Sequence, residues 1–315
     1  MEFAVSHQDI IEAHERISPY IHRTPILTSQ SVNEIAGCEL HFKCENFQKI
    51  GAFKARGGLN AVLSLPDDQR KNGVVTHSSG NHAQAIALAA KMAGVPAYIV
   101  MPKTAPEVKK KAVAGYGAEI TFCEPTQHAR EKNAARIQKE RSATFISPYN
   151  DYAVITGQAT CAKELIEDEE GLDMIVTPVG GGGLSAGTAL SALYMDDRID
   201  VSCGEPEGAM DTYLSMQKGV ITKVDSPKTI ADGLLASMGD KNFEIIKELV
   251  SKVFVVNDEE ITEAMRLIWE RMKIIIEPSC AVPVAAILKN KEYYTGKKVG
   301  VILTGGNVDV GKLPF

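Results

Sequence analysis

Short apolar runs of strand length alternate with helical patterns along the chain, and this alternation limits the possible folds more than any other feature. We expect buried strands over residues 40–44, 74–77, 97–101, 119–123, 174–177, 201–204 and 299–304. Strands separated by helices favour parallel pairing, because each parallel connection must cross the sheet and a helix makes that crossing. The sequence therefore predicts an α/β fold.

Two segments between these strands carry clear helical signals. Residues 81–93 are rich in alanine and stop before Gly94, a residue type that favours helix ends. Farther along the chain, apolar side chains recur at helical spacing at positions 261, 265, 268 and 272. Asn257 and Glu260 predict a capping box at the start of that second helix.

The length of 315 residues corresponds to about two domains of usual size. Residues 73–150 contain a strand–helix series of their own, and the segments on both sides of it contain further strands. We therefore expect residues 1–72 and 151–315 to form a large domain, with residues 73–150 inserted as a small one. The chain ends soon after Gly305-Gly306-Asn307, so we expect no C-terminal effector module.

Charge and composition argue against several kinds of partner. The chain has 34 basic and 40 acidic side chains, a net charge of −6, which gives no general positive field for nucleic acid or an anionic membrane. No apolar run approaches the ~18 residues of a spanning helix, and the first residues resemble no secretory signal, so we expect a cytoplasmic protein. Six scattered cysteines, without a CxxC pair, indicate neither a disulfide framework nor a zinc site.

A lysine in the segment 43–58 is a candidate nucleophile. Lys54 follows a predicted strand, and Phe53 beside it could supply an apolar wall. A lysine forms a Schiff base when its ammonium is desolvated and its pKa falls. Taken alone, such a lysine is more often one of many solvated lysines than a nucleophile.

Four consecutive glycines follow the predicted strand at 174–177. Gly180 to Gly183 precede a helical segment, so their bare backbone and the helix N-terminus could bind a phosphate through N–H groups. Such a run costs conformational entropy unless something requires exposed backbone. The alternative is a flexible turn.

Two further polar loops end predicted strands. The first, His77-Ser78-Ser79-Gly80-Asn81-His82, offers hydroxyls and free N–H groups to a carboxylate, although Ser79 or Asn81 alone is more often a helix cap. The second, Leu303-Thr304-Gly305-Gly306-Asn307, presents a hydroxyl at the end of the last strand.

Together with Glu277-Pro278-Ser279, these motifs stand in the order and spacing of one family. From about residue 15 to 310 the chain resembles the fold type II pyridoxal-phosphate enzymes of the serine/threonine dehydratase family, and among them most closely the serine racemases. The resemblance implies two three-layer α/β domains with twisted, mostly parallel sheets, as in the tryptophan synthase β subunit. It also implies pyridoxal 5'-phosphate as the cofactor.

The resemblance implies a role for each matching residue around the cofactor. Lys54 carries the imine and works on one face of the substrate Cα, and Thr304 faces the pyridine nitrogen. A neutral hydroxyl stabilises a protonated ring less than an aspartate would, which favours β-elimination over transamination. The implied cofactor-binding residues are Phe53, Lys54, Asn81, Gly180, Gly181, Gly182, Gly183, Leu184, Glu277 and Thr304.

On the substrate side, Ser79 matches the second acid/base of the racemases, on the face opposite Lys54, which makes racemisation available. Arg130 and Ser237 match positions that contact the carboxylates of dicarboxylate inhibitors, so Arg130 could receive the second carboxylate of 3-hydroxyaspartate. The alternative for Arg130 is a surface ion pair with Glu131 or another neighbour. The implied substrate-binding residues are Ser79, Asn81, His82, Arg130 and Ser237.

The resemblance also implies a divalent-cation loop. Glu205 and Asp211 would supply carboxylates and Ala209 its carbonyl, a set of hard oxygen ligands that suits Mg²⁺ or Ca²⁺. The alternative is a negatively charged loop without a metal.

The implied activity is that of a serine racemase and dehydratase acting on β-hydroxy amino acids. Alternatives within the family are a threo-3-hydroxyaspartate ammonia-lyase and a catabolic threonine dehydratase. The resemblance further implies a homodimer and raises a nucleotide effector as a question.

Two other classes compete with the enzyme interpretation. A dinucleotide-binding dehydrogenase fits Gly181-x-Gly183-x-x-Ala186 and Glu205, but it leaves Lys54 and the serine loop unexplained. A non-catalytic ligand-binding relative would not need Lys54 and Ser79.

Overall fold

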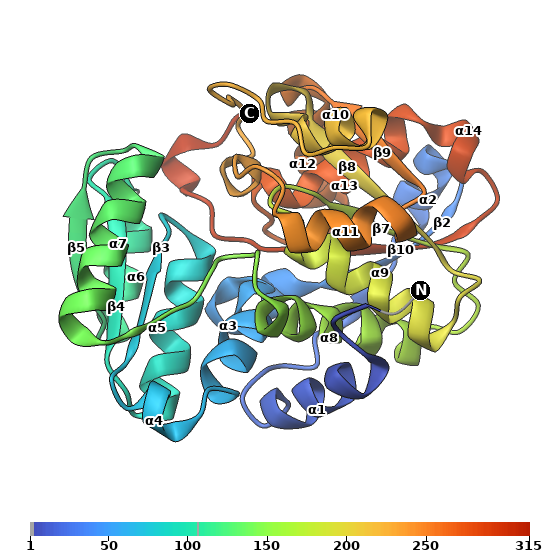
Figure 1. Cartoon of the computed structure of the whole chain (residues 1–315). Coiled ribbons are helices and arrows are strands. Elements are labelled where there is room, and N and C mark those ends of the chain that lie inside the picture. Colours follow the sequence, from blue (N-terminus) through green and yellow to red (C-terminus); the bar gives the residue numbers. More distant parts are fainter. Residues whose placement is uncertain (1–2, 106) are drawn as a thin grey trace.

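The computed structural model describes residues 3–105 and 107–315 and contains two β-sheets (Figure 1). One sheet has six strands in the order β1-β2-β10-β7-β8-β9, and the other has four in the order β5-β4-β3-β6. Strand β1 is antiparallel to β2, and the other strand pairs are parallel. The α/β class with mostly parallel sheets is confirmed.

The strands are β1 (Ile26–Leu27), β2 (Glu39–Cys44), β3 (Val74–His77), β4 (Ala97–Pro102), β5 (Glu119–Cys123), β6 (Thr144–Phe145), β7 (Met174–Pro178), β8 (Asp200–Pro206), β9 (Lys252–Val256) and β10 (Lys298–Leu303). The α-helices are α1 (His7–Ile17), α2 (Gln30–Ala36), α3 (Lys54–Leu63), α4 (Asp67–Arg70), α5 (Asn81–Ala93), α6 (Glu107–Gly115), α7 (Gln127–Arg141), α8 (Tyr152–Asp168), α9 (Gly183–Met195), α10 (Asp211–Lys218), α11 (Asp240–Leu249), α12 (Asp258–Met272), α13 (Pro278–Lys289) and α14 (Lys291–Tyr294). Short 3-10 turns are η1 (Glu45–Phe47), η2 (Lys49–Gly51), η3 (Glu207–Ala209), η4 (Asp232–Leu234) and η5 (Val310–Lys312).

All seven predicted strands are present, with ends that differ from the prediction by at most two residues. The capping box of α12 is also present, formed by Asn257 and Glu260. Three strands were not predicted. β1 and β6 have two residues each and are too short for a periodic signal, whereas β9 carries an apolar run that was overlooked.

Alternation along the strands produces two buried layers around each sheet. In β10, Val301 joins the core formed with α2, α12 and α13, while Ile302 joins the core formed with α1, α8, α9 and α11. In β3, Val74 packs with α3 and α5, and Val75 packs with α7. Because successive side chains point to opposite faces, each sheet is covered on both sides. The predicted three-layer architecture is therefore confirmed.

The four strands β3 to β6 all come from the segment between residues 74 and 145, and α5, α6 and α7 accompany them at the left of Figure 1. We propose residues 73–150 as the small domain and residues 1–72 and 151–315 as the large domain. Helix α3 joins the two, because it packs against both α5 and α8. A Cβ on Gly58 would lie 2.8 Å from the Ala85 side chain, and one on Gly157 would lie 2.6 Å from the Gly57 backbone.

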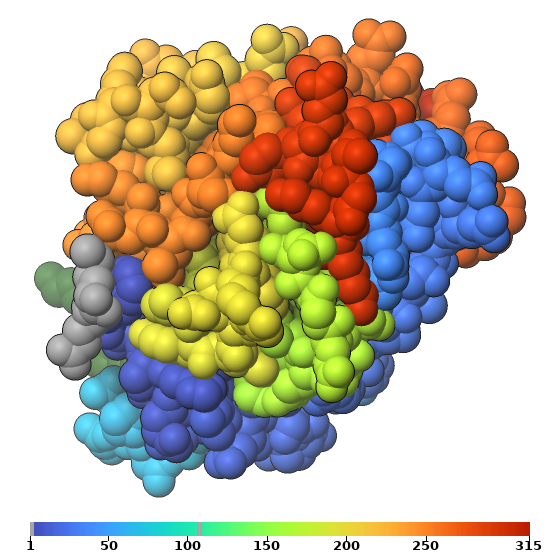
Figure 2. All heavy atoms as spheres, turned by 90° about the vertical axis from the view of Figure 1, so that its right-hand side faces the viewer, coloured from blue at the N-terminus to red at the C-terminus, as the bar shows by residue number. Residues whose placement is uncertain are grey.

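The parallel strands of the large sheet begin at one edge. There the N–H of Glu39 donates to the Lys297 carbonyl and the N–H of Asp173 to the Lys298 carbonyl, so the starts of β2, β7 and β10 lie side by side. In Figure 2 blue, red and yellow-green segments of the chain adjoin one another on the surface. The carboxyl ends of these strands consequently lie together at the opposite end of the sheet, which is where ligands bind in open parallel sheets.

In the described part of the chain, no helix is long and apolar enough to cross a membrane.

Candidate active site

The predicted motifs follow the carboxyl ends of four parallel strands. The lysine segment follows β2, the glycine loop follows β7, Thr304 follows β10, and the serine loop follows β3 of the small domain. Hydrogen bonds join these loops across the two sheets, as described below. The fold therefore brings together residues separated by 196 and 226 positions in the sequence.

Lys54 is the first residue of α3, and its neighbours hold it against the end of β10. Phe53 donates its N–H to the Thr304 carbonyl at 3.0 Å, and Ala52 forms an isolated bridge with Gly305. The Lys54 Nζ donates to the Pro148 carbonyl at 2.7 Å and lies 5.0 Å from the centre of the Phe53 ring. Burial of the amine lowers the pKa of Lys54 to about 8. The predicted desolvated lysine beside an apolar ring is thus present.

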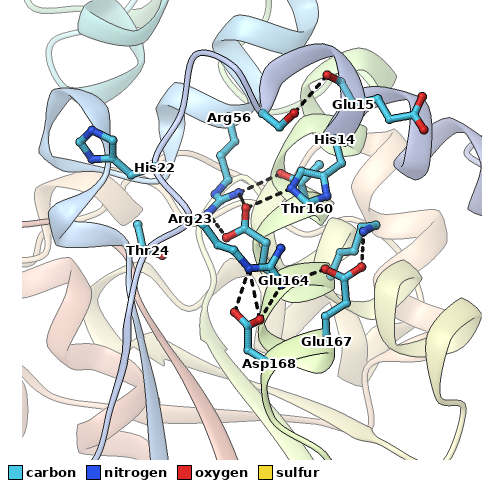
Figure 3. A network of polar contacts seen from close by, with 12 residues as sticks. His14, Glu15, His22, Arg23, Thr24, Arg56, Thr160, Glu164, Glu167 and Asp168 are labelled. Carbon is cyan, nitrogen blue, oxygen red and sulfur yellow. Dashed lines mark hydrogen bonds and ion pairs between the residues drawn. The ribbon is translucent and has the colours of Figure 1, made fainter.

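The first turn of α3 is fixed by a buried ionic cluster. Arg56 is fully buried, and its guanidinium donates to both carboxylate oxygens of Glu45 and both of Glu164, each at 2.8 Å. Figure 3 shows Arg56 together with Glu164, Thr160 and His14. Lys43 pairs with Glu164 at 2.8 Å. Glu164 also accepts from His14 at 3.2 Å, and the surrounding positive groups hold its pKa well below the usual range. The motif around Lys54 contained Arg56, but nothing in the sequence showed its distant partners.

The glycine loop has the features of an anion site. Gly180 to Gly183 and Leu184 are buried, and within the described chain none of their N–H groups donates to another backbone or side-chain group. Several of these amides lie at the N-terminus of α9, where the helix dipole favours an anion. Unpaired buried N–H groups are costly without a ligand, so this loop fits a phosphate.

Two of the glycines are required by their surroundings. A Cβ on Gly181 would lie 2.4 Å from the ring of Tyr149, and Gly182 has a φ of +96°, a conformation that L side chains rarely adopt. Tyr149 therefore packs directly against the loop. Tyr149 lies just before the N-cap of α8, Asp151, and no local pattern in the sequence indicates its contact with the glycine loop.

Asn81 and Glu277 connect the loop after β3 with the start of α13. Asn81 Nδ2 donates to Glu277 Oε1 at 2.7 Å, and its Oδ1 accepts from Asn307 Nδ2 at 2.9 Å. Asn307 also donates to the carbonyl of Ile50, at 2.7 Å. Ile50 has a φ of +61°, which is strained for a β-branched residue. Asn307 belongs to the polar loop expected at the end of β10, but its two partners are distant in the sequence and were not predicted.

Glu277 is buried, and burial raises its pKa to about 7 against the opposing attraction of Lys109. Its second oxygen, Oε2, has no hydrogen-bond partner among the described residues. His82, the residue after Asn81, is also buried, and burial lowers its pKa well below the usual range. Both groups lie next to the loop that carries Ser79.

The structure does not show the surface ion pair that was the alternative interpretation of Arg130. Arg130 lies near the start of α7, and in the part of the chain that the structure describes its side chain forms no ion pair or hydrogen bond. Its Nε is buried without a partner. The guanidinium therefore remains available for an anion. Ser237 lies two residues before Gly239, whose N–H donates to Gly181 at 3.2 Å, so its loop adjoins the glycine loop.

Two carboxylates, Glu205 and Asp211, lie at the end of β8 and at the start of α10, which follows it. Glu205 accepts from the N–H groups of Thr212 and Tyr213 at 2.8 and 2.7 Å, and Asp211 accepts from Met238 N–H at 2.7 Å. Burial raises the pKa of Glu205 to about 8 and that of Asp211 to about 6. The described residues contain no cluster of three or more His, Cys, Asp or Glu side chains that could hold a metal.

The comparisons with known proteins agree with this geometry. A family model described as pyridoxal-phosphate dependent enzyme matches residues 17–305. The chain belongs to this family. It is 51% identical to a beta-hydroxyaspartate dehydratase of Paracoccus denitrificans (strain Pd 1222) over 310 residues, 98% of both chains.

A second relative is the serine racemase of Dictyostelium discoideum, 51% identical over 313 residues, which cover 98% of this chain and 97% of the relative. Among solved structures, a pyridoxal 5'-phosphate-dependent aspartate racemase matches with a TM-score of 0.95 at 41% identity, over 100% of this chain and 99% of that one. The predicted family, fold type II architecture, pyridoxal-phosphate dependence and racemase or ammonia-lyase class are confirmed.

The residues of this pyridoxal-phosphate enzyme fit the cofactor. The buried Lys54 amine would hold its aldehyde carbon, the free N–H groups of the glycine loop its phosphate, and Thr304 would face its ring nitrogen. Membership in this family also excludes the dinucleotide-binding dehydrogenase.

Exchanging Gly181 for alanine tests the glycine loop. The added methyl would meet the Tyr149 ring at 2.4 Å, so Gly181→Ala should displace the phosphate-binding amides and weaken cofactor binding by about tenfold or more. Titrating the apoenzyme with pyridoxal phosphate and following its visible absorbance measures this change. Adding Tyr149→Ala should remove the clash and restore most of the affinity. Equal affinity of Gly181→Ala and the unchanged protein would contradict the assignment.

Proposed function

We propose that the protein removes the Cα proton of β-hydroxy amino acids, with serine as a principal substrate. It then either returns a proton to the opposite face or expels the β-hydroxyl as water. In the second case the released enamine hydrolyses to a keto acid and ammonia. Bound pyridoxal phosphate supplies the electron sink that makes the Cα–H bond acidic.

The observation that carries this proposal is the state of Lys54. Its amine is buried, and among the residues that the structure describes it donates to the Pro148 carbonyl and to no carboxylate. A pKa of about 8 leaves a useful fraction of neutral amine near neutral pH, which can accept a proton at Nζ.

Ser79 is the proposed second acid/base. It lies between Ser78, whose hydroxyl accepts from Gly80 N–H at 3.2 Å, and Asn81, which is anchored to Glu277 at 2.7 Å. This anchoring gives a short hydroxyl-bearing loop a defined position next to the cofactor-binding residues. Stereoinversion requires such a group in addition to Lys54, because the proton must be delivered to the other face of Cα.

Substitution of the two groups separates their roles. Lys54→Ala should abolish all turnover, whereas Ser79→Ala should suppress racemisation and elimination from D-serine by about 100-fold or more and affect L-serine elimination much less. Incubating each variant with each serine isomer, then quantifying keto acid and both enantiomers, measures this difference. Equal losses for the two isomers would argue against a two-residue mechanism. Absence of turnover by the unchanged enzyme on any hydroxy amino acid would instead favour a non-catalytic binding protein.

A specific observation favours 3-hydroxyaspartate as a second substrate. The Arg130 guanidinium has a buried Nε without a partner, and it can bind a carboxylate through two parallel hydrogen bonds. Relatives that match over the whole chain include a beta-hydroxyaspartate dehydratase and an aspartate racemase, whose named substrates carry two carboxylates. We propose that Arg130, with Ser237, receives the second carboxylate. Threonine is the other alternative substrate, and no feature of the described residues specifically favours it.

The substitution Arg130→Met keeps most of the side-chain volume and removes the charge. It should raise the KM for threo-3-hydroxyaspartate by about tenfold or more and leave the KM for serine almost unchanged. Arg136→Met on the same helix is the control, because Arg136 pairs at 2.6 Å with Glu140 and is half exposed. A similar loss for both substrates would assign Arg130 to helix stability rather than to substrate choice.

We also propose that Glu205, Asp211 and the Ala209 carbonyl hold Mg²⁺ or Ca²⁺, with water completing the coordination. Two neighbouring buried carboxylates with raised pKa values are supporting evidence, since a cation would stabilise both as anions. The cation would also stabilise the position of Asp211, which accepts a hydrogen bond from the N–H of Met238.

Chelation tests the cation. Treatment with EDTA should lower the activity and the unfolding temperature, and Mg²⁺ or Ca²⁺ should restore both. The variant Asp211→Asn should respond much less to either treatment. Full activity and an unchanged melting curve in metal-free buffer would contradict the proposed site.

The homodimer, the nucleotide effector and the cytoplasmic location stay predictions of the resemblance and of the sequence.

A further inference from the structure

Lys109 makes a contact between the two domains that the proposed mechanism does not use. It lies on α6 of the small domain, and its Nζ is 2.7 Å from Oδ2 of Asp232 in η4 of the large domain. The two side chains differ in exposure: Lys109 is 7% exposed and Asp232 is 52% exposed. The nearly buried Lys109 ammonium is thus paired with the half-exposed carboxylate of Asp232.

The charge of Lys109 is maintained by the large domain. Burial by itself lowers the pKa of Lys109, but the attraction of Asp232 and Glu277 outweighs burial and raises it. Glu277 has one oxygen bonded to Asn81, and the other has no partner in the described chain. The ammonium therefore lies within the field of two carboxylates that both belong to the large domain.

Lys109 also lies against the loop that carries Ser79. A Cβ built on Gly80 would be 3.5 Å from Lys109 Nζ, so the ammonium lies next to the backbone of this loop. The following residue, Asn81, is attached to Glu277 at 2.7 Å. The two residues after Ser79 are thus both held from the large domain. Gly80 lies next to Lys109, whose ammonium is paired with Asp232, and Asn81 is bonded to Glu277.

We propose that Lys109 is a positioning residue for Ser79: its ion pair with Asp232 holds the Ser78–Gly80 loop in place while the two domains enclose the substrate. This inference rests on the proposed function, because it assigns Lys109 a role in the step that Ser79 performs. Asp232 is half exposed, so the ion pair is screened by water and can open to admit substrate and release product. The pair then couples closure of the domains to the position of the Ser79 hydroxyl.

Variants of the holoenzyme test this role. Lys109→Met removes the ammonium and keeps the apolar stem, and Asp232→Asn removes the partner from a half-exposed position where misfolding is not expected. Lys103→Met is the matched control, because Lys103 forms an exposed ion pair with Glu124 at 2.7 Å within the small domain. In both test variants the ratio of D-serine to L-serine elimination should fall by about tenfold, since a small displacement of a reacting group is enough for such a loss. The control should retain the ratio of the unchanged enzyme.

Charge reversal distinguishes this role from a purely structural one. Lys109→Glu and Asp232→Lys should each reduce the D/L ratio, and the double variant should recover part of it because the pair is restored in the opposite sense. The visible absorbance of bound cofactor should be the same in all variants. An unchanged D/L ratio in Lys109→Met, or equal losses for both isomers without recovery in the double variant, would overturn the proposal.

A second measurement does not depend on turnover. Hydrogen exchange followed by mass spectrometry should show faster exchange of the peptide that covers residues 76–86 in Lys109→Met and Asp232→Asn, but not in Lys103→Met. If the unchanged enzyme proves inactive on serine while this exchange pattern is present, the proposed function fails and the loop contact stands. If the enzyme is active and exchange is the same in all variants, the contact fails and the proposed function stands.

Discussion

The buried pairing of Arg56 with Glu45 and Glu164 is the interaction on which the geometry around Lys54 depends. Arg56 stands two residues after Lys54, in the first turn of α3, and four hydrogen bonds to the two carboxylates fix its guanidinium. Breaking one side of such a buried pair would leave an uncompensated charge, at a cost of about 3–5 kcal/mol. The turn that presents Lys54 is therefore fixed by charge on one side. On the other side the backbone of Phe53 is bonded to Thr304, so Lys54 has little freedom to leave the site.

This anchoring explains how a desolvated lysine is compatible with a stable fold. The positive charge of Arg56 is matched by nearby carboxylates, whereas the Lys54 amine faces a carbonyl and an aromatic ring. An amine without a neighbouring carboxylate has a lowered pKa, because nothing compensates the loss of water around its charged form. Arg56 and Lys54 lie in the same helical turn but in opposite environments. The paired Arg56 stabilises the fold, and the unpaired Lys54 is available for the reaction.

The sequence was sufficient for the architecture and for the residues that belong to recognisable motifs. Buried strands such as Val74–His77 give a continuous apolar signal, and Gly180 to Gly183 stand out because bare backbone is costly without a ligand. The sequence could not show which side chains meet across the fold. Glu164 is 108 residues from Arg56, and Asp232 is 123 residues from Lys109, so neither spacing gives a local pattern. Arg130 was likewise ambiguous until the structure showed that it has no ion-pair partner among the described residues.

The unpaired polar groups of the structure explain why these distant contacts matter for chemistry. Buried polar groups are normally bonded, yet the glycine-loop amides, the Arg130 Nε and the second oxygen of Glu277 all lack partners within the described chain. Amides and a guanidinium attract anions, and a substrate amino acid held beside the phosphorylated cofactor would bring a carboxylate and a phosphate together. These groups come from the loops of both sheets, so a bound ligand completes hydrogen bonds that neither set of loops can complete alone. Ligand binding should therefore stabilise the observed arrangement of these loops, because a ligand placed between them satisfies the groups on both sides at once.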